Sequence, residues 1–295
     1  MPEARVDEVD APPSLLGLYA RSAAGSLLPG RPAGLPERRL VLRGVEIDLD
    51  RLARYARVCG CRIGAELPPT YPHLLGFALE LRLMSDRSFP FPVLGIVHVA
   101  NRIEQLRPVP VDSRPDVLVH AANLRPHRSG SRFDVVTEVE LGGETAWRER
   151  STYLRPGAPV AGATGATGAP EDGGRGLAEP AGPVVAEWSI AGDVGRRYAE
   201  VSGDRNPIHI HPLLAKPFGF PGAIAPGMWT KARCLAALEG RLGDAFEAEV
   251  EFRKPLRIPA RVRLRLGRRG EGWRFALEPA AGGDGRPHLT GSAGG

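Results

Sequence analysis

The chain contains little cysteine and no long apolar segment. Only three residues of 295 are cysteine, Cys59, Cys61 and Cys234, and so sparse and odd a set argues against a disulfide scaffold. No apolar run approaches the roughly 20 residues that a membrane-spanning helix needs. The first residues are acidic, and no basic flank precedes an apolar core, so no signal peptide is indicated. From these absences we expect a cytoplasmic protein with no part in a membrane.

Several motifs typical of cofactor sites, metal sites and hydrolases are also missing. No glycine-rich loop of the phosphate-binding or dinucleotide-binding type occurs. Ser202-Gly203-Asp204 lacks the glycine pattern of a serine nucleophile on a sharp turn. His209 and His211 are spaced to share one face of a strand, but no third metal ligand is nearby and Pro212 flanks one of them. We therefore expect neither a cofactor nor a metal.

The charge of the chain is slightly positive, with a formal net charge of +5 and a pI of about 9.4. The densest group of arginines, within 253–269, alternates with Val262, Leu264 and Leu266. This alternation is typical of a strand with one solvated face. The alternative is that the arginines attract an anionic substrate, such as a phosphorylated carrier or a nucleotide tail. No nucleic-acid-binding motif accompanies them, so nucleic acid is not an expected partner.

Composition divides the chain into two parts. A length of 295 residues exceeds what one hydrophobic core usually supports. The segment 156–182 is rich in glycine, alanine, proline and threonine and shows no apolar periodicity. Such a segment cannot bury enough surface to offset its ordering entropy, so it predicts a flexible linker. We expect one domain over 1–155 and another over 183–295.

Both parts repeat one order of elements. In the second part, a short helix over 193–201 and an amphipathic helix over 228–240 precede three strands. In the first part, a helix over 73–84 is likewise followed by strands. After each long helix, a strand ends in a basic residue followed by proline, at Arg107-Pro108 and at Lys254-Pro255. This repetition indicates an internal duplication and an α+β fold, in which an antiparallel sheet curls around a central helix twice over.

The segment 198–212, YAEVSGDRNPIHIHP, carries the most chemical information. Asp204 and His209 are five residues apart, a spacing that points them in different directions on a strand or on a helix. Gly203 and Asn206-Pro207 require a turn instead, and a turn can bring the carboxylate and the imidazole together. Aspartate is ionised at neutral pH and histidine titrates near it, which suits proton transfer with a held water. The alternative is that Asp204 only caps the turn and His209 only packs.

A second candidate element, 222–229, opens the second long helix. Gly227 near the helix N-terminus allows a ligand oxygen to approach the backbone. The free N–H groups and the helix dipole there favour developing negative charge. One oxyanion donor of this kind can supply about 3 kcal/mol of transition-state stabilisation. Pro226-Gly227 is equally typical of a plain helix start, and only its pairing with the Asp204–His209 turn favours an oxyanion site.

Residues 198–229 resemble the signature of the MaoC-like (R)-specific enoyl-thioester hydratases and 3-hydroxyacyl-thioester dehydratases. Three groups of residues carry the resemblance: Gly203-Asp204-x-Asn206-Pro207-Ile208-His209, Pro217-Phe218-Gly219 and Gly227-Met228. The resemblance implies a double hot-dog fold, two antiparallel sheets each wrapped around a long central helix. It also implies that 183–295 is the catalytic unit and that 1–155 is a degenerate, substrate-accommodating unit.

The resemblance further implies a role for each matched residue. Asp204 and His209 would hold and deprotonate the water that adds to the β-carbon, and would return a proton to the α-carbon. The Gly227 N–H would bind the thioester oxygen as an enolate forms, and Asn206 would brace the turn. The implied partner is an acyl-CoA or acyl-carrier-protein thioester of fatty-acid metabolism, with no cofactor. Pro226 departs from the family, which commonly has histidine there, and this puts rate or selectivity in doubt.

Two alternative functions remain at this point. One is a non-catalytic subunit that binds acyl thioesters, and Pro226 is its best support. The other is a hot-dog thioesterase, in which Asp204 would act at the carbonyl carbon. The resemblance is compatible with a homodimer of double hot-dogs.

Overall fold

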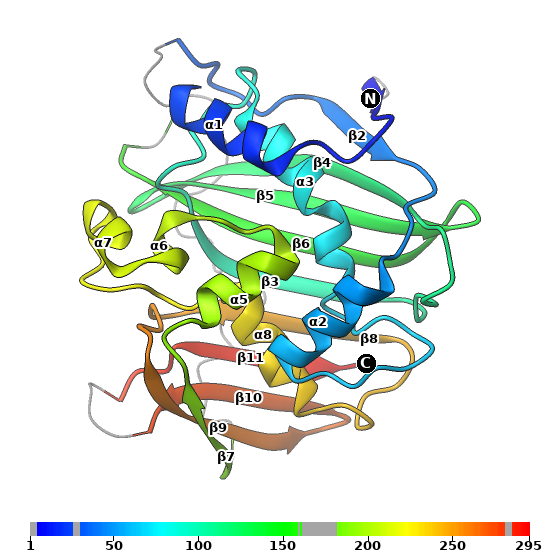
Figure 1. Cartoon of the computed structure of the whole chain (residues 1–295), viewed down its shortest axis with the longest axis vertical. Coiled ribbons are helices and arrows are strands. Elements are labelled where there is room, and N and C mark those ends of the chain that lie inside the picture. Colours follow the sequence, from blue (N-terminus) through cyan, green and yellow to red (C-terminus); the bar gives the residue numbers. More distant parts are fainter. Residues whose placement is uncertain (1–4, 26–29, 159, 161–181, 281–284) are drawn as a thin grey trace. The chain divides into compact units, whose positions relative to one another are not determined.

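The computed structural model describes residues 5–25, 30–158, 160, 182–280 and 285–295 (Figure 1). The chain forms two compact units. Unit 1 comprises Met1–Ile47, Pro72–Asn101 and Asp112–Pro170, and unit 2 comprises Asp48–Tyr71, Arg102–Val111 and Glu171–Gly295. Segments 48–71 and 102–111 precede the predicted linker in the chain and yet pack in unit 2. Nearly all of the predicted linker 156–182 lies outside the described residues.

Unit 1 contains a sheet in the strand order β1-β2-β4-β5-β6. Its strands are β1 (Arg5–Glu8), β2 (Arg38–Leu42), β4 (Asp116–His127), β5 (Gly130–Leu141) and β6 (Glu144–Pro156). Neighbouring strands are antiparallel except for β1 and β2, which are parallel. β3 (Val97–Gln105) carries the chain from unit 1 into unit 2.

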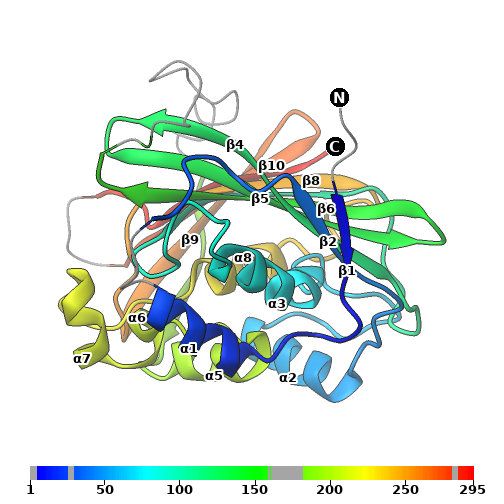
Figure 2. The same ribbon diagram turned by 90° about the horizontal axis from the view of Figure 1, so that it is seen from above.

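Helix α3 (Pro72–Ser85) packs on this sheet against β4 and β5, and α1 (Leu15–Gly25) packs on α3 (Figure 2). Gly76 permits the close approach of α3 to β5, because a Cβ there would lie 2.5 Å from Thr137 Cγ2. The long helix predicted over 73–84 is therefore present and lies at the core of its unit.

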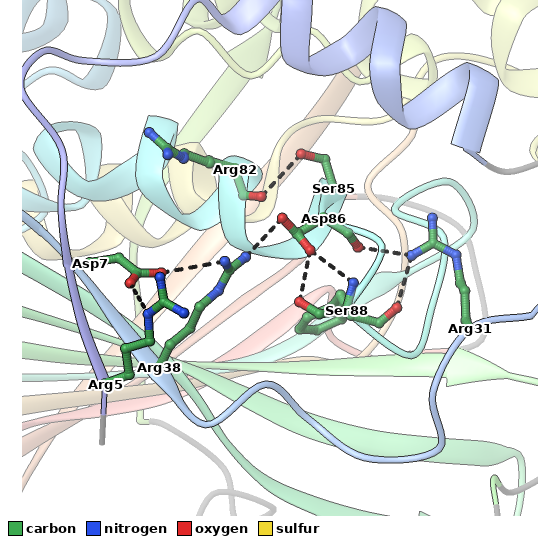
Figure 3. A network of polar contacts seen from close by, with 9 residues as sticks. Arg5, Asp7, Arg31, Arg38, Arg82, Ser85, Asp86 and Ser88 are labelled. Atoms are coloured by element: carbon green, nitrogen blue, oxygen red, sulfur yellow. Dashed lines mark hydrogen bonds and ion pairs between the residues drawn. The ribbon is translucent and has the colours of Figure 1, made fainter. Parts of the chain in front are cut away.

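A polar network holds the loop that follows α3 (Figure 3). Asp86 accepts hydrogen bonds from Ser88 and pairs with Arg38 at 2.9 Å. Burial raises the pKa of Asp86, but these partners outweigh burial and lower the pKa to about 2. Arg31 Nη1 donates to the carbonyl oxygens of Asp86, Phe89 and Phe91 at 2.9–3.2 Å. The network fixes the loop while the Phe89 and Phe91 rings enter the core of unit 1.

Unit 2 contains an antiparallel sheet in the order β8-β11-β10-β9-β7. Its strands are β7 (Val184–Ile190), β8 (Phe246–Phe252), β9 (Ala260–Arg269), β10 (Gly272–Pro279) and β11 (Leu289–Gly294). In β9, Val262, Leu264 and Leu266 are buried and the arginines between them are not, so the predicted solvated strand face is confirmed.

The part of unit 2 that the structure describes contains the helices α2 (Leu49–Cys59), α5 (Val194–Ser202), α6 (Pro207–Ile210), α7 (Pro212–Ala215), the short 3-10 helix η1 (Lys216–Phe218) and α8 (Gly227–Ala236). α2 packs against both α5 and α8. α8 ends at Ala236, earlier than the predicted 240, because residues 237–240 continue as turns. Among the described residues, no helix is long and apolar enough to cross a membrane.

Candidate active site

Gly203 ends α5 and turns the chain into the predicted Asp204–His209 loop. Its φ of 81° lies in the left-handed region that favours glycine, and its N–H donates to the Ala199 carbonyl at 2.9 Å. The next N–H, that of Asp204, donates to Ser202 Oγ at 3.0 Å. The reversal predicted at Gly203 is therefore present, and it fixes the backbone of Asp204 to the last turn of α5.

Asn206 organises the other end of the loop. Its backbone N–H donates to Asp204 Oδ1 at 3.1 Å, and its side-chain oxygen accepts from Ile208 N at 3.4 Å. Asn206 is thereby the N-cap of α6, and Pro207 occupies the first turn, where proline needs no hydrogen-bond acceptor. These bonds direct the Asp204 carboxylate and place His209 one turn into α6.

Asp204 and His209 face each other. His209 Nε2 lies 3.7 Å from Asp204 Oδ2, and the side chains are 10% and 24% exposed, respectively. His209 Nδ1 lies 2.8 Å from the Ile224 carbonyl oxygen, a geometry in which Nδ1 carries the proton and donates it. Nε2 then points toward the Asp204 carboxylate. A gap of 3.7 Å is too long for a direct hydrogen bond and lets one water contact both groups.

The segment 223–225 connects this pair to the start of α8. Ile224 N donates to the Ile208 carbonyl at 3.0 Å, so Ile224 binds α6 through both of its backbone polar groups. Ala225 N donates to the Leu256 carbonyl at 2.8 Å. Three residues after Ile224, α8 begins at Gly227, whose N–H belongs to the helix turn that has no intrahelical acceptors. Gly227 also packs under the Phe252 ring, which a Cβ would approach to 3.0 Å.

Gly195 is a site residue that the sequence reasoning missed. A Cβ at this position would overlap the carbonyl oxygen of His209, so only glycine lets α5 and α6 lie this close. Gly195 lies fourteen residues before His209 and within an ordinary helix. No feature of the local sequence links the two residues.

Other candidate groups lie apart from this pair or are used elsewhere. His211 is exposed, and its Nδ1 accepts from Leu213 N as the N-cap of α7. Burial raises the pKa of the Cys234 thiol to about 12, which disfavours a thiolate nucleophile there at neutral pH.

Among the described residues, the one group with metal-ligand spacing is His73, Glu80 and Glu149, buried in unit 1. It is a hydrogen-bonded network, in which His73 Nδ1 contacts Glu149 Oε2 at 2.8 Å and Thr137 Oγ1 donates to Glu80 Oε1 at 2.9 Å.

Comparison with known proteins assigns the family. Residues 183–278 match the family model described as a MaoC like domain. The chain is 39% identical over 279 residues to 3-hydroxyacyl-thioester dehydratase X of Mycobacterium tuberculosis, an alignment that covers 94% of this chain and 97% of that protein.

Solved structures agree. The crystal structure of HtdX from Mycobacterium tuberculosis superposes with a TM-score of 0.75 at 37% identity, covering 88% of this chain and 100% of that one. A MaoC-like dehydratase from Phytophthora capsici gives a TM-score of 0.70 at 17% identity, covering 87% and 94%. A further Mycobacterium tuberculosis protein, described as having a double hot-dog fold, gives 0.53 at 13% identity, covering 86% and 94%. The fold is the predicted double hot-dog, and the chain belongs to the MaoC-like dehydratase family.

Proposed function

We propose that the chain is a hydro-lyase that reversibly hydrates an enoyl thioester to the (R)-3-hydroxyacyl thioester. The substrate would be linked to CoA or to acyl-carrier protein, within fatty-acid metabolism. The proposal rests on one observation: Asp204 Oδ2 and His209 Nε2 face each other at a distance of 3.7 Å. The dehydratase from Mycobacterium tuberculosis, similar along nearly its whole length, supports the same reaction class.

In the hydration direction, the Asp204 carboxylate and His209 Nε2 hold the water between them. The hydrogen bond from His209 Nδ1 to the Ile224 carbonyl fixes the tautomer, so Nε2 is free to accept a proton. The water oxygen bonds to the β-carbon while one of its protons passes to the pair. The π electrons of the double bond move toward the thioester carbonyl, and a proton returned by the pair to the α-carbon completes the addition.

The start of α8 supplies the complementary charge. As the double bond shifts, negative charge develops on the thioester oxygen. The Gly227 N–H, at the positive end of α8, is the donor that we assign to that oxygen. Pro226 contributes no N–H, but it precedes the donor and leaves it intact. Asn206 acts through the loop geometry, as the N-cap of α6, and takes no part in proton transfer.

The test is an assay with crotonyl-CoA. Loss of the enoyl absorbance without release of free thiol supports hydration. Release of thiol would replace the proposal by a hot-dog thioesterase. Binding of acyl-CoA with neither change would support a non-catalytic acyl-thioester-binding subunit. Pro226 favours this second candidate, because the resemblance implies a histidine at that position.

We also propose a division of labour along the chain. Residues 183–295 provide the catalytic hot-dog, 156–182 the linker, and 1–155 the unit that accommodates the acyl chain. The assembly that we expect is a homodimer of double hot-dogs in the cytoplasm. Light scattering of the purified chain measures its mass and would exclude the dimer if only the monomer were found.

A further inference from the structure

We propose that Arg51 is a positioning residue for the catalytic loop. Its guanidinium holds the last turn of α5, and through that turn it sets the Asp204 carboxylate opposite His209. This inference rests on the proposed function, because it assumes that the Asp204–His209 pair performs the reaction.

Arg51 reaches the end of α5 from a neighbouring helix. It lies in the first turn of α2, where its backbone N–H donates to the N-cap residue Asp48 at 2.9 Å. Its side-chain Nε donates to the Val201 carbonyl at 2.6 Å, and its Nη2 donates to the Ser202 carbonyl at 3.4 Å. A fixed cation thus caps carbonyl groups that have no intrahelical donor, at the negative end of a helix.

The capped turn is the one from which Asp204 is held. Ser202 Oγ donates to the Tyr198 carbonyl at 2.8 Å and accepts from Asp204 N at 3.0 Å. Arg51 therefore binds the carbonyl of the same residue whose hydroxyl fixes the Asp204 backbone. Only Gly203 lies between this turn and Asp204, and the Ser202 Oγ bond ties Asp204 directly to the turn, so a shift of the turn moves the carboxylate.

His209 is anchored by different contacts. Its ring is held by the Ile224 carbonyl, and its backbone lies against Gly195 in the first turn of α5. Removal of the Arg51 side chain therefore loosens one member of the pair and leaves the other in place. The expected consequence is a wider or more variable gap between Oδ2 and Nε2, which a single water bridges poorly. A displacement of about 1 Å costs roughly 100-fold in rate when reacting groups must be aligned.

The α2 helix does not depend on Arg51 for its own packing. Leu52, Tyr55 and Ala56 are at most 3% exposed, and the Tyr55 ring lies 6.3 Å from the Tyr198 ring of α5. Loss of the guanidinium is therefore expected to leave the α2–α5 contact in place. Arg57, on the same helix and exposed, provides a matched control for the loss of one arginine.

The experiment measures kcat, KM and thermal stability of the full chain with crotonyl-CoA, or with a longer enoyl-CoA that the wild type hydrates better. Arg51→Met is expected to lower kcat about 10- to 100-fold and to change KM less than about 3-fold. Arg51→Lys keeps the charge but loses the two-pronged donor geometry, so it is expected to recover part of the lost kcat. Arg57→Met is expected to match the wild type. Free guanidinium at millimolar concentration is expected to restore part of the activity of Arg51→Ala.

Three results would overturn the inference. The first is a kcat for Arg51→Met within 3-fold of wild type. The second is an increase in the KM of Arg51→Met with kcat unchanged. The third is a loss of kcat in Arg51→Lys as large as in Arg51→Met, together with no rescue of Arg51→Ala by guanidinium. If Arg51→Met unfolds, Arg51→Lys and the guanidinium rescue decide the question. Asp204→Asn is measured in parallel. Retained activity in Asp204→Asn would refute the proposed mechanism itself, whereas an inactive Asp204→Asn beside an active Arg51→Met would refute only the role of Arg51.

Discussion

The Ile224 carbonyl orients the His209 imidazole in the candidate site. The Ile224 carbonyl accepts the Nδ1 proton at 2.8 Å, and the same residue donates its own N–H to Ile208 at 3.0 Å. The imidazole is thus fixed in rotation and in tautomer by one backbone segment. Its other nitrogen, Nε2, lies 3.7 Å from Asp204 Oδ2. The pair is therefore preorganised so that His209 Nε2 and the Asp204 carboxylate can share one water.

Substitution of either member is expected to abolish most of the activity. Asp204→Asn removes the negative charge and His209→Ala removes the acceptor, and each change is expected to lower kcat about 10²- to 10⁴-fold. Asp204 is partly exposed, so the fold is expected to persist in Asp204→Asn, and thermal melting checks that His209→Ala, which truncates a buried ring, is still folded. His211→Ala, which changes an exposed cap residue, is the control. The mechanism would be wrong if both variants hydrated enoyl-CoA within a few-fold of wild type while remaining folded.

Gly195→Ala is expected to impair both stability and activity. The added methyl group would overlap the His209 carbonyl oxygen, so α5 and α6 must separate. We expect a loss of about 1–3 kcal/mol in unfolding free energy, from overpacking, and a fall in kcat as His209 moves. Urea denaturation and steady-state kinetics measure the two effects. The control is Gly243→Ala, whose Cβ would meet its nearest atom at an ordinary 3.6 Å. Equal behaviour of the two variants would contradict the close contact.

The parts of the site that are local in sequence could be predicted. Gly203 and Asn206-Pro207 indicate a turn on their own chemistry, and such a turn can bring Asp204 and His209 near each other. The start of α8 at Gly227 follows from the same kind of local signal.

The contacts that join distant segments could not be predicted. Arg51 meets Val201 across 150 residues, and no periodicity in either helix indicates the other as its partner. For the same reason, the packing of segment 48–71 in unit 2 was not visible in the sequence. β11 was missed for another reason: LTGSAG consists mainly of small residues with weak strand preference. Its Gly291 is required because a Cβ would lie 2.5 Å from the Phe275 ring.

Glu80 gives unit 1 a predicted pH dependence. Burial, with an added contribution from the charge of Glu149, raises the pKa of Glu80 to about 7, although His73 opposes the shift. The folded state then holds a proton that the unfolded chain releases near its ordinary value of 4.5. Stability from this group is fully present below about pH 4.5 and is lost as the pH rises to about 7. The loss amounts to at most about 3 kcal/mol.

Glu80→Gln isolates this contribution, because glutamine resembles the neutral carboxyl group. The variant is expected to be about as stable as wild type at pH 5 and more stable at pH 8. Urea denaturation of both proteins between pH 5 and 8 measures the difference, in which the titrating groups that do not interact with Glu80 cancel. Glu37→Gln, at an exposed position, is the control for charge alone. A difference between wild type and Glu80→Gln that stays constant with pH would contradict the assignment.

The isolated segment 183–295 is expected to fold poorly and to be inactive. Such a fragment lacks α2, which covers Tyr198 and Ala199 of α5. It also lacks the Val58 carbonyl of α2, which accepts a hydrogen bond from Trp229 Nε1. It also lacks Arg51, so the last turn of α5 loses its cap next to Asp204. Circular dichroism, thermal melting and enoyl-CoA hydration compare the fragment with the full chain.

Because α2 precedes the linker, proteolysis between 161 and 181 is a matched control that cuts the chain but retains α2. If the cut protein remains associated and active while the isolated fragment 183–295 is inactive, activity requires the contacts of α2 and does not require an uncut chain. Full activity of 183–295 alone would refute that requirement.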